Sequence, residues 1–145
     1  MMVTIKRVSI NELNKLVLLS YSGDSEGLEK YHLQPFTLED AAMCTVNMIR
    51  NESKGANFIY YRISYQQRPI GYFVVGNEVL YSFCINIKYR RPKIVMEWWN
   101  QVIKMFKGGF YTAIYDNNTR ALNFLKRRGM KVVSVENNIV KLIKL

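Results

Sequence analysis

The residues best able to bind an anionic ligand lie in the second half of this 145-residue chain. Residues 88–145 hold thirteen Lys and Arg against three acidic residues, whereas residues 1–87 hold eight of each, so the net charge of +10 falls in the second half. One interpretation is that these charged residues lie on solvated helix faces, as some of them are expected to. The other interpretation is a surface that meets a polyanion, such as coenzyme phosphates, nucleic acid or an acidic protein.

Few groups in the sequence can serve as metal ligands or as a general acid or base. His32 is the one histidine and no CxxC pair is present, so no zinc site is expected. Glu78 is expected at a hairpin in solvent, and Glu97, on a predicted helix, is expected to pair with a nearby Arg or Lys. Asp116 ends the fifth predicted strand and is either a candidate base or a turn residue. The sequence therefore identifies no catalytic residue and predicts no bound metal.

The composition is that of one globular domain spanning residues 1–145, because 49% of the residues are hydrophobic and 13% are aromatic. No apolar run approaches the ~20 residues that span a bilayer. The N-terminus lacks the pattern of a signal peptide. Cys44 and Cys84 fall in a predicted helix and a predicted strand, so we expect buried thiols in a reducing compartment. The chain is expected to be neither secreted nor membrane-spanning.

Hydrophobic periodicity predicts seven strands and four helices in the order β-α-α-β-β-β-α-β-α-β-β. The strand after the third helix should run parallel to its predecessor, because a crossover helix separates them. The prediction is thus an α/β (α+β) fold with a mixed, twisted sheet. Adjacent helical residues point about 100° apart, so at most one of Trp98 and Trp99 is expected to face the sheet squarely. The predicted strands are 3–8, 57–65, 69–76, 78–87, 110–115, 130–136 and 139–144, and the helices are 9–20, 37–51, 92–107 and 118–129.

This order resembles the GCN5-related N-acetyltransferase fold over nearly the whole chain. RPIGYFVV is similar to the third strand of that family, and LYSFCINIKYRR is similar to its fourth strand and coenzyme loop. NNTRALNFLKRRGM resembles a late motif of the family, in which Asn118, Ala121, Phe124, Lys126 and Gly129 fall in place. The resemblance implies acetyl-CoA as the cofactor. It implies a site formed by the strand edge at Ile85–Ile87 together with Arg90, Arg91, Lys93 and Asn118.

The sequence departs from the family at two points. Lys93 and Val95 stand where the coenzyme loop has small residues, and Pro92 removes one amide donor. Leu125 stands where many active members carry a tyrosine that protonates the departing thiolate. On these grounds the sequence predicts a non-catalytic protein with no cofactor bound. The stretch NFLKRRGM, with a leucine after the aromatic residue, resembles the small acetyltransferase-like virion proteins of short-tailed bacteriophages.

That prediction places the chain in a virion or the host cytoplasm, as a head–tail connector ring or a packaged internal protein. Its partners would be other virion proteins and itself, as a homo-oligomer and possibly a ring. Non-specific DNA contact would use the basic surface formed by Lys126, Arg127, Arg128 and Lys131. The alternatives are an acetyl-CoA-dependent N-acetyltransferase, in which Arg90, Arg91 and Lys93 replace the glycine loop, and a free nucleic-acid-binding protein.

Overall fold

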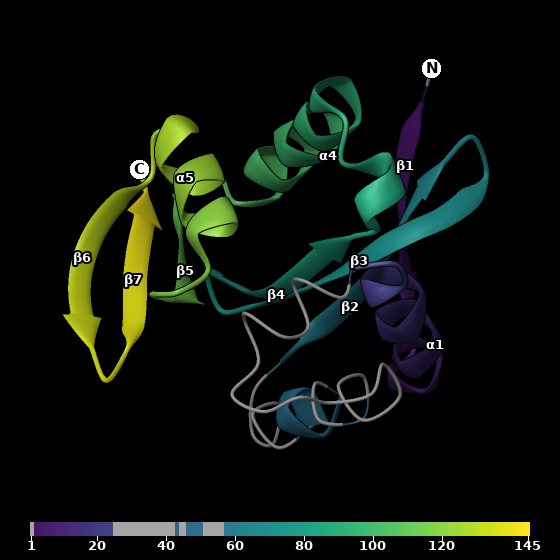
Figure 1. Cartoon of the computed structure of the whole chain (residues 1–145), viewed down its shortest axis with the longest axis horizontal. Helices are drawn as coiled ribbons and strands as arrows, with labels where there is room; N and C mark the ends of the chain where they lie inside the picture. Colours follow the sequence, from purple (N-terminus) through teal and green to yellow (C-terminus); the bar gives the residue numbers. More distant parts are fainter. Residues whose placement is uncertain (1, 25–42, 44–45, 51–56) are drawn as a thin grey trace.

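The computed structural model describes residues 2–24, 43, 46–50 and 57–145 (Figure 1). A seven-stranded sheet crosses the molecule in the order β1-β2-β3-β4-β5-β7-β6. Figure 1 shows α1 on one face of this sheet and α4 and α5 on the other. The sheet is mixed, because β4 pairs parallel with β5 while every other neighbouring pair is antiparallel. This is the α/β architecture that the sequence predicts.

The first four strands form an antiparallel meander around one helix. Two tight turns connect three of these strands, and each places two consecutive residues at positive φ, Gln66-Gln67 and Asn77-Glu78. Such turns match the right-handed twist of the flanking strands. Leu13 and Val17 of the helix pack against Tyr72 and Val74 of the sheet. The elements are β1 (Val3–Val8), α1 (Ile10–Tyr21), β2 (Ile59–Tyr65), β3 (Arg68–Gly76) and β4 (Val79–Ile85).

The second half adds α4 and a three-stranded C-terminal part. Pro92 occupies the first turn of α4, as expected for a residue without an N–H. Asn137 and Asn138, both at positive φ, form the final hairpin turn. The elements are η1 (Ile87–Tyr89), α4 (Pro92–Met105), β5 (Phe110–Tyr115), α5 (Thr119–Arg127), β6 (Lys131–Glu136) and β7 (Ile139–Lys144).

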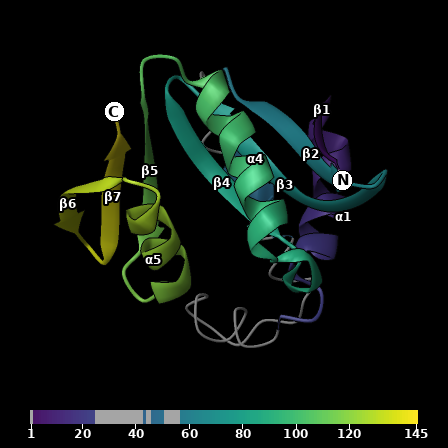
Figure 2. The ribbon, with the colours of Figure 1, turned by 90° about the horizontal axis from the view of Figure 1, so that it is seen from above.

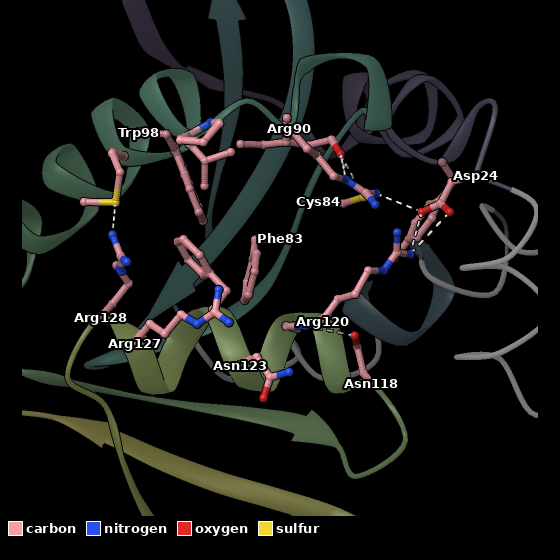
Figure 3. Close-up of a pocket in the computed structure, with 17 residues that line it drawn as sticks. Asp24, Phe83, Cys84, Arg90, Trp98, Asn118, Arg120, Asn123, Arg127 and Arg128 are labelled. Carbon is pink, nitrogen blue, oxygen red and sulfur yellow. Dashed lines mark hydrogen bonds and ion pairs between the residues drawn. The ribbon is translucent and has the colours of Figure 1, made fainter.

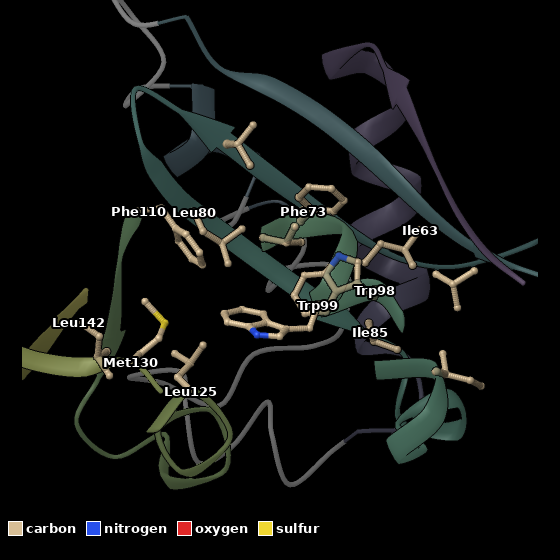
Figure 4. Close-up of a cluster of buried hydrophobic side chains, with 14 of the residues drawn as sticks. Ile63, Phe73, Leu80, Ile85, Trp98, Trp99, Phe110, Leu125, Met130 and Leu142 are labelled. Carbon is tan, nitrogen blue, oxygen red and sulfur yellow. The ribbon is translucent and has the colours of Figure 1, made fainter. Parts of the chain in front are cut away.

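Both tryptophans of α4 are buried, and they cover different neighbours, as expected for side chains that point about 100° apart. Trp98 and Trp99 are each 1% exposed (Figure 4). Trp98 packs against Phe73 of β3, with ring centroids 5.9 Å apart. Trp99 packs against Phe124 of α5, with centroids 5.5 Å apart. Because α4 is covered by the sheet and by α5, two side chains about 100° apart are both buried.

The fourth strand ends two residues earlier than predicted, because Asn86 turns the chain. Its side-chain Oδ1 accepts a hydrogen bond from Lys88 N at 3.0 Å and so caps η1. Its Nδ2 donates to Leu19 O at 2.7 Å and thereby ties the strand end to α1. The predicted helix 37–51 falls largely outside the described residues, although residues 46–50 are helical. Among the described residues, no helix has the length and apolar character needed to cross a bilayer.

Candidate functional site

Strands β4 and β5 pair at one end only and then separate. Their ladder consists of Val79↔Tyr111 and Leu80↔Thr112. The register of β3 against β4 shifts at the next residue, which leaves Tyr81 as an extra residue in β4. An inserted residue of this kind bends its strand. Beyond Leu80, β4 therefore diverges from β5, and Figure 2 shows α4 and α5 on either side of the resulting gap.

The edge of β4 that borders this gap carries backbone groups without a neighbouring strand. Asn86 N donates to Ile70 O at 2.7 Å, so the backbone groups of Asn86 face β3. Successive residues of a strand direct their N–H and C=O groups to alternate sides of it. The N–H and C=O groups of Phe83 and Ile85 therefore face the gap. Arg90 Nε donates to Ile85 O at 2.7 Å and occupies part of this edge. The other polar groups of the edge face the gap.

A pocket of about 570 Å³ occupies the gap (Figure 3). That volume lies in the range of small-molecule and cofactor sites. Tyr21 and Cys84 belong to the α1 side of the sheet, whereas Trp98 and Phe124 belong to the other side. The pocket therefore reaches both faces of the sheet. Its lining consists of Tyr21, Asp24, Phe83, Cys84, Ile85, Arg90, Pro92, Val95, Met96, Trp98, Asn118, Arg120, Ala121, Asn123, Phe124, Arg127 and Arg128.

The lining carries a strong positive charge, because four arginines face one carboxylate. Asp24 is 3% exposed and pairs with both Arg90, at 2.9 Å, and Arg120, at 3.2 Å. These ion pairs join the chain after α1 to the segment before α4 and to the first turn of α5. Arg127 and Arg128 lie further along α5 and add two more positive charges to the same pocket.

Hydroxyl and thiol groups lie on the α1 side of the sheet beside the gap, and two of the residues that carry them, Tyr21 and Cys84, line the pocket. Tyr72 Oη lies 2.9 Å from Ser82 Oγ, and Tyr21 hydrogen-bonds Tyr72. Burial raises the pKa of both tyrosines above the usual value. Burial also raises the pKa of Cys84 to about 11, against the opposing effect of Arg90. These groups are therefore neutral at pH 7 and can donate protons in hydrogen bonds, but none of them is a general base.

The thiol makes stability pH-dependent in the alkaline range. The pKa of Cys84 is higher in the folded state than that of a free thiol, so the contribution of this group to stability is fully present below about pH 8.5 and is lost as the pH rises towards 11. The tyrosines act in the same direction above their ordinary pKa. Denaturant unfolding at pH 7, 9 and 10.5 should show this loss, and Cys84→Ala should reduce the slope. An identical slope in wild type and variant would show that the thiol does not contribute.

Three of the six residues predicted to bind a coenzyme line the pocket: Ile85, Arg90 and Asn118. Asn118 caps α5, because its Oδ1 accepts a hydrogen bond from Ala121 N at 3.2 Å. The other three lie outside the lining. Ile87 belongs to η1 and is 38% exposed, not part of the strand edge.

Arg91 and Lys93 are exposed and also lie outside the lining. Residues Pro92, Val95 and Met96 line the pocket at the i, i+3 and i+4 spacing of one helix face. Lys93 is one residue removed from that face and points elsewhere. Of the two residues that stand in place of the small residues of the family's coenzyme loop, Val95 borders the pocket and Lys93 does not.

The basic surface predicted from the sequence is divided in two. Arg127 and Arg128 line the pocket, whereas Lys126 and Lys131 are exposed and lie outside its lining. The division follows from helix geometry, because Arg120 and Arg127 are seven residues apart and share one face of α5. Lys126 lies off that face.

Other expectations have mixed outcomes. Leu125 is fully buried, as expected for a core residue. Glu78 is exposed in a turn, as expected, and Asp116 is also exposed in a turn. Within the described part of the chain Glu97 makes no salt bridge, contrary to expectation; its Oε1 instead accepts a hydrogen bond from the backbone N of Val3 at 2.7 Å. His32 and Cys44 lie outside the described residues, and Cys84 is a buried free thiol.

Sequence reasoning missed Asp24, Arg120, Tyr21 and the role of Cys84 in the lining. The Asp24–Arg120 pair joins residues 96 positions apart, and no local pattern predicts such a contact. The seven-residue spacing of Arg120 and Arg127 on a predicted helix was a usable signal. It indicates that both side chains share a face, although not which neighbour that face meets.

No family model and no curated protein matches the sequence. Solved structures do match, at low sequence identity. An acetyltransferase from Thermus thermophilus has 14% identity, a TM-score of 0.75 and coverage of 99% of this chain and 97% of its own. The PaiA N-acetyltransferase from Thermoplasma acidophilum, in complex with coenzyme A, has 16% identity, a TM-score of 0.69 and 99% coverage of each chain.

A GCN5-related N-acetyltransferase from Rhodopseudomonas palustris has 12% identity and a TM-score of 0.69, and covers 99% of this chain and 96% of its own. Identities this low speak for the fold alone. The strand order of the seven-stranded mixed sheet is consistent with these matches. The chain therefore has the GCN5-related N-acetyltransferase fold.

Proposed function

We propose that the chain binds an acyl-coenzyme A thioester, most simply acetyl-CoA, in the gap between β4 and β5 and transfers the acyl group to an amine. The observation that carries this proposal is the unpaired edge of β4, which faces a pocket of about 570 Å³ open to both faces of the sheet. The likeness in fold to the acetyltransferases described above supports it.

The residues of the gap fit the narrow arm of coenzyme A. This pantetheine arm carries two amides, which can bond a strand edge as a neighbouring strand would. The backbone N–H and C=O groups of Phe83 and the N–H of Ile85 face the gap for this purpose. Apolar contact is available from Val95, Ala121 and Phe124, which line the opposite walls.

The two faces of the pocket give the ligand a direction. Tyr21 and Cys84 border it on the α1 side, where they are neutral and can donate hydrogen bonds. The acyl end of the ligand belongs on this side, and the phosphate end belongs between α4 and α5, where Arg127 and Arg128 lie. An amine can then approach the acyl group from the face opposite to α4 and α5.

Acyl transfer from acetyl-CoA to an amine needs little from the protein beyond the positioning of the two reactants. Acetyl-CoA supplies a thioester whose carbonyl carbon the amine attacks; a C–N bond forms, the C–S bond breaks and coenzyme A leaves as the thiolate, which then takes up a proton from solvent. The proton lost by the amine passes to solvent. Holding the two reactants together supplies most of the rate. A free thiol has a pKa of about 8.5, so its thiolate leaves without an acid at position 125, where this chain has a leucine.

The expectation of an empty site depended on the turn at residues 92–95. In the structure, Lys93 of this turn lies outside the pocket lining, and Arg120, Arg127 and Arg128 border the pocket instead. No finding links the chain to virion proteins. The proposed ring, its partner chains and its DNA contacts therefore stay predictions.

The test is a thiol-release assay with acetyl-CoA and a panel of primary amines, including peptides with free N-termini, followed by mass spectrometry of the acetylated product. Release of coenzyme A should saturate with acetyl-CoA and should depend on amine concentration. Calorimetry with acetyl-CoA should show a saturable signal. The absence of any heat signal at millimolar acetyl-CoA would overturn the proposal and leave the fold with a non-catalytic role.

A further inference from the structure

Among the described residues, Arg128 finds no good acceptor for its charge. Its Nη1 contacts the thioether sulfur of Met96, which is a weak acceptor. Its Nε is buried and makes no hydrogen bond within the described part of the chain. The guanidinium also lies over the ring of Phe124, 5.6 Å from the centroid. A buried guanidinium nitrogen without an acceptor is costly, and an anion in the pocket would supply one.

Arg127 adds a second cation beside it. It is exposed, it lines the pocket, and Figure 3 shows its side chain extending into the space between α4 and α5. No hydrogen bond or ion pair of its side chain is found among residues 2–24, 43, 46–50 and 57–145. Two adjacent guanidinium groups, each able to bind a phosphate through paired hydrogen bonds, thus border one pocket.

Further polar residues lie on the same face of α5, closer to the N-terminus of the helix. Asn123 and Arg120 precede Arg127 by four and seven residues, and both line the pocket. Seven helical residues rise about 10.5 Å, so the polar stripe is long enough to meet more than one phosphate group. At its far end Arg120 is paired with Asp24.

The turn before α4 offers less to an anion. Pro92 has no N–H, and the side chains of Arg91 and Lys93 are exposed outside the pocket lining. Lys93 and Ile94 retain first-turn amides, but the charged side chains of the pocket come mainly from α5. The charge available to a phosphate-bearing ligand is therefore displaced from the α4 turn to the α5 face.

We propose that Arg127 and Arg128 form a phosphate-binding site for the 3′-phosphorylated ADP part of the coenzyme, with Arg120 and Asn123 extending it along α5. This inference rests on the proposed function, because it assigns the phosphate end of the same ligand. In this site, side chains of α5 bind the phosphate groups in place of backbone amides of the α4 turn.

The experiment is calorimetry on the full chain with three probes: coenzyme A, 3′-dephospho-coenzyme A and adenosine 3′,5′-bisphosphate. Arg127→Gln and Arg128→Gln should each weaken coenzyme A binding by about 10- to 100-fold, as expected for a lost hydrogen bond to a charged group. Lys126→Gln is the matched control, because Lys126 lies on the same helix with the same charge but outside the lining. It should change affinity by less than about twofold.

Wild type should bind 3′-dephospho-coenzyme A more weakly than coenzyme A. If Arg127 and Arg128 contact the 3′-phosphate, the difference in affinity between these two ligands should be smaller in Arg127→Gln and Arg128→Gln than in wild type. Unchanged thermal unfolding would show that the variants are folded, and Arg127, being exposed, is the safer of the two. Equal losses with Lys126→Gln, or no loss with the arginine variants, would overturn the inference while coenzyme binding stands.

If wild type binds no coenzyme A, the proposed function fails, and adenosine 3′,5′-bisphosphate then decides the phosphate site alone. Binding of this probe that depends on Arg127 and Arg128 would support the site. No binding, or binding that the two variants do not change, would overturn it.

Discussion

Ala121→Phe is expected to abolish coenzyme binding, with a loss of affinity of more than about 100-fold. Ala121 lies in the first turn of α5 and lines the pocket opposite the edge of β4. A benzyl side chain in place of a methyl group would occupy the space that the pantetheine arm needs. Calorimetry with acetyl-CoA measures the loss directly, and the thiol-release assay should fall with it.

The matched control is Lys126→Phe, which adds the same aromatic ring to the same helix at an exposed position outside the lining. It should leave the dissociation constant within about twofold of wild type. Wild-type affinity in Ala121→Phe would mean that the coenzyme does not pass between α5 and β4, and the proposed position of the ligand would then be wrong.

Trp99→Ala should lower the free energy of unfolding by about 3–5 kcal/mol, the usual cost of removing a buried large aromatic side chain. Trp99 is 1% exposed, and its ring lies 5.6 Å from Phe110 and 5.5 Å from Phe124, measured between centroids. It joins α4 to β5 and α5, so its loss should weaken the two walls of the pocket together. Urea or guanidinium unfolding, analysed with a common m-value, provides the measurement.

Val135→Ala serves as the comparison for this effect, because Val135 is 60% exposed on the edge strand β6. It should change the free energy of unfolding by less than about 0.5 kcal/mol. A loss below about 1 kcal/mol in Trp99→Ala would contradict the description of this residue as a packed part of the core.

The order of elements was predictable because it depends on local patterns. Asn137-Asn138 is a hairpin signal, and the structure places both residues at positive φ in the last turn. Pro92 marked the start of α4. The end of β4 was not predictable in the same way, because it depends on hydrogen bonds from Asn86 to the α1 segment, 67 residues away in sequence at Leu19.

The candidate site was predictable only in part, for a related reason. The sequence shows which residues share a helix face, and Arg120 and Arg127 share one. It does not show which neighbour that face meets. The pairing of Asp24 with Arg90 and Arg120, and the direction of Lys93 away from the pocket, depend on how α1, α4 and α5 are placed around the sheet. Tertiary placement therefore decides the chemistry of this pocket.

A crystal structure of the chain with acetyl-CoA tests the central proposal most directly. We predict electron density for the pantetheine arm along the backbone edge of Phe83 and Ile85, with the phosphate groups between α4 and α5 beside Arg127 and Arg128. An empty gap at saturating acetyl-CoA, or a coenzyme bound outside the space between β4 and α5, would contradict the account.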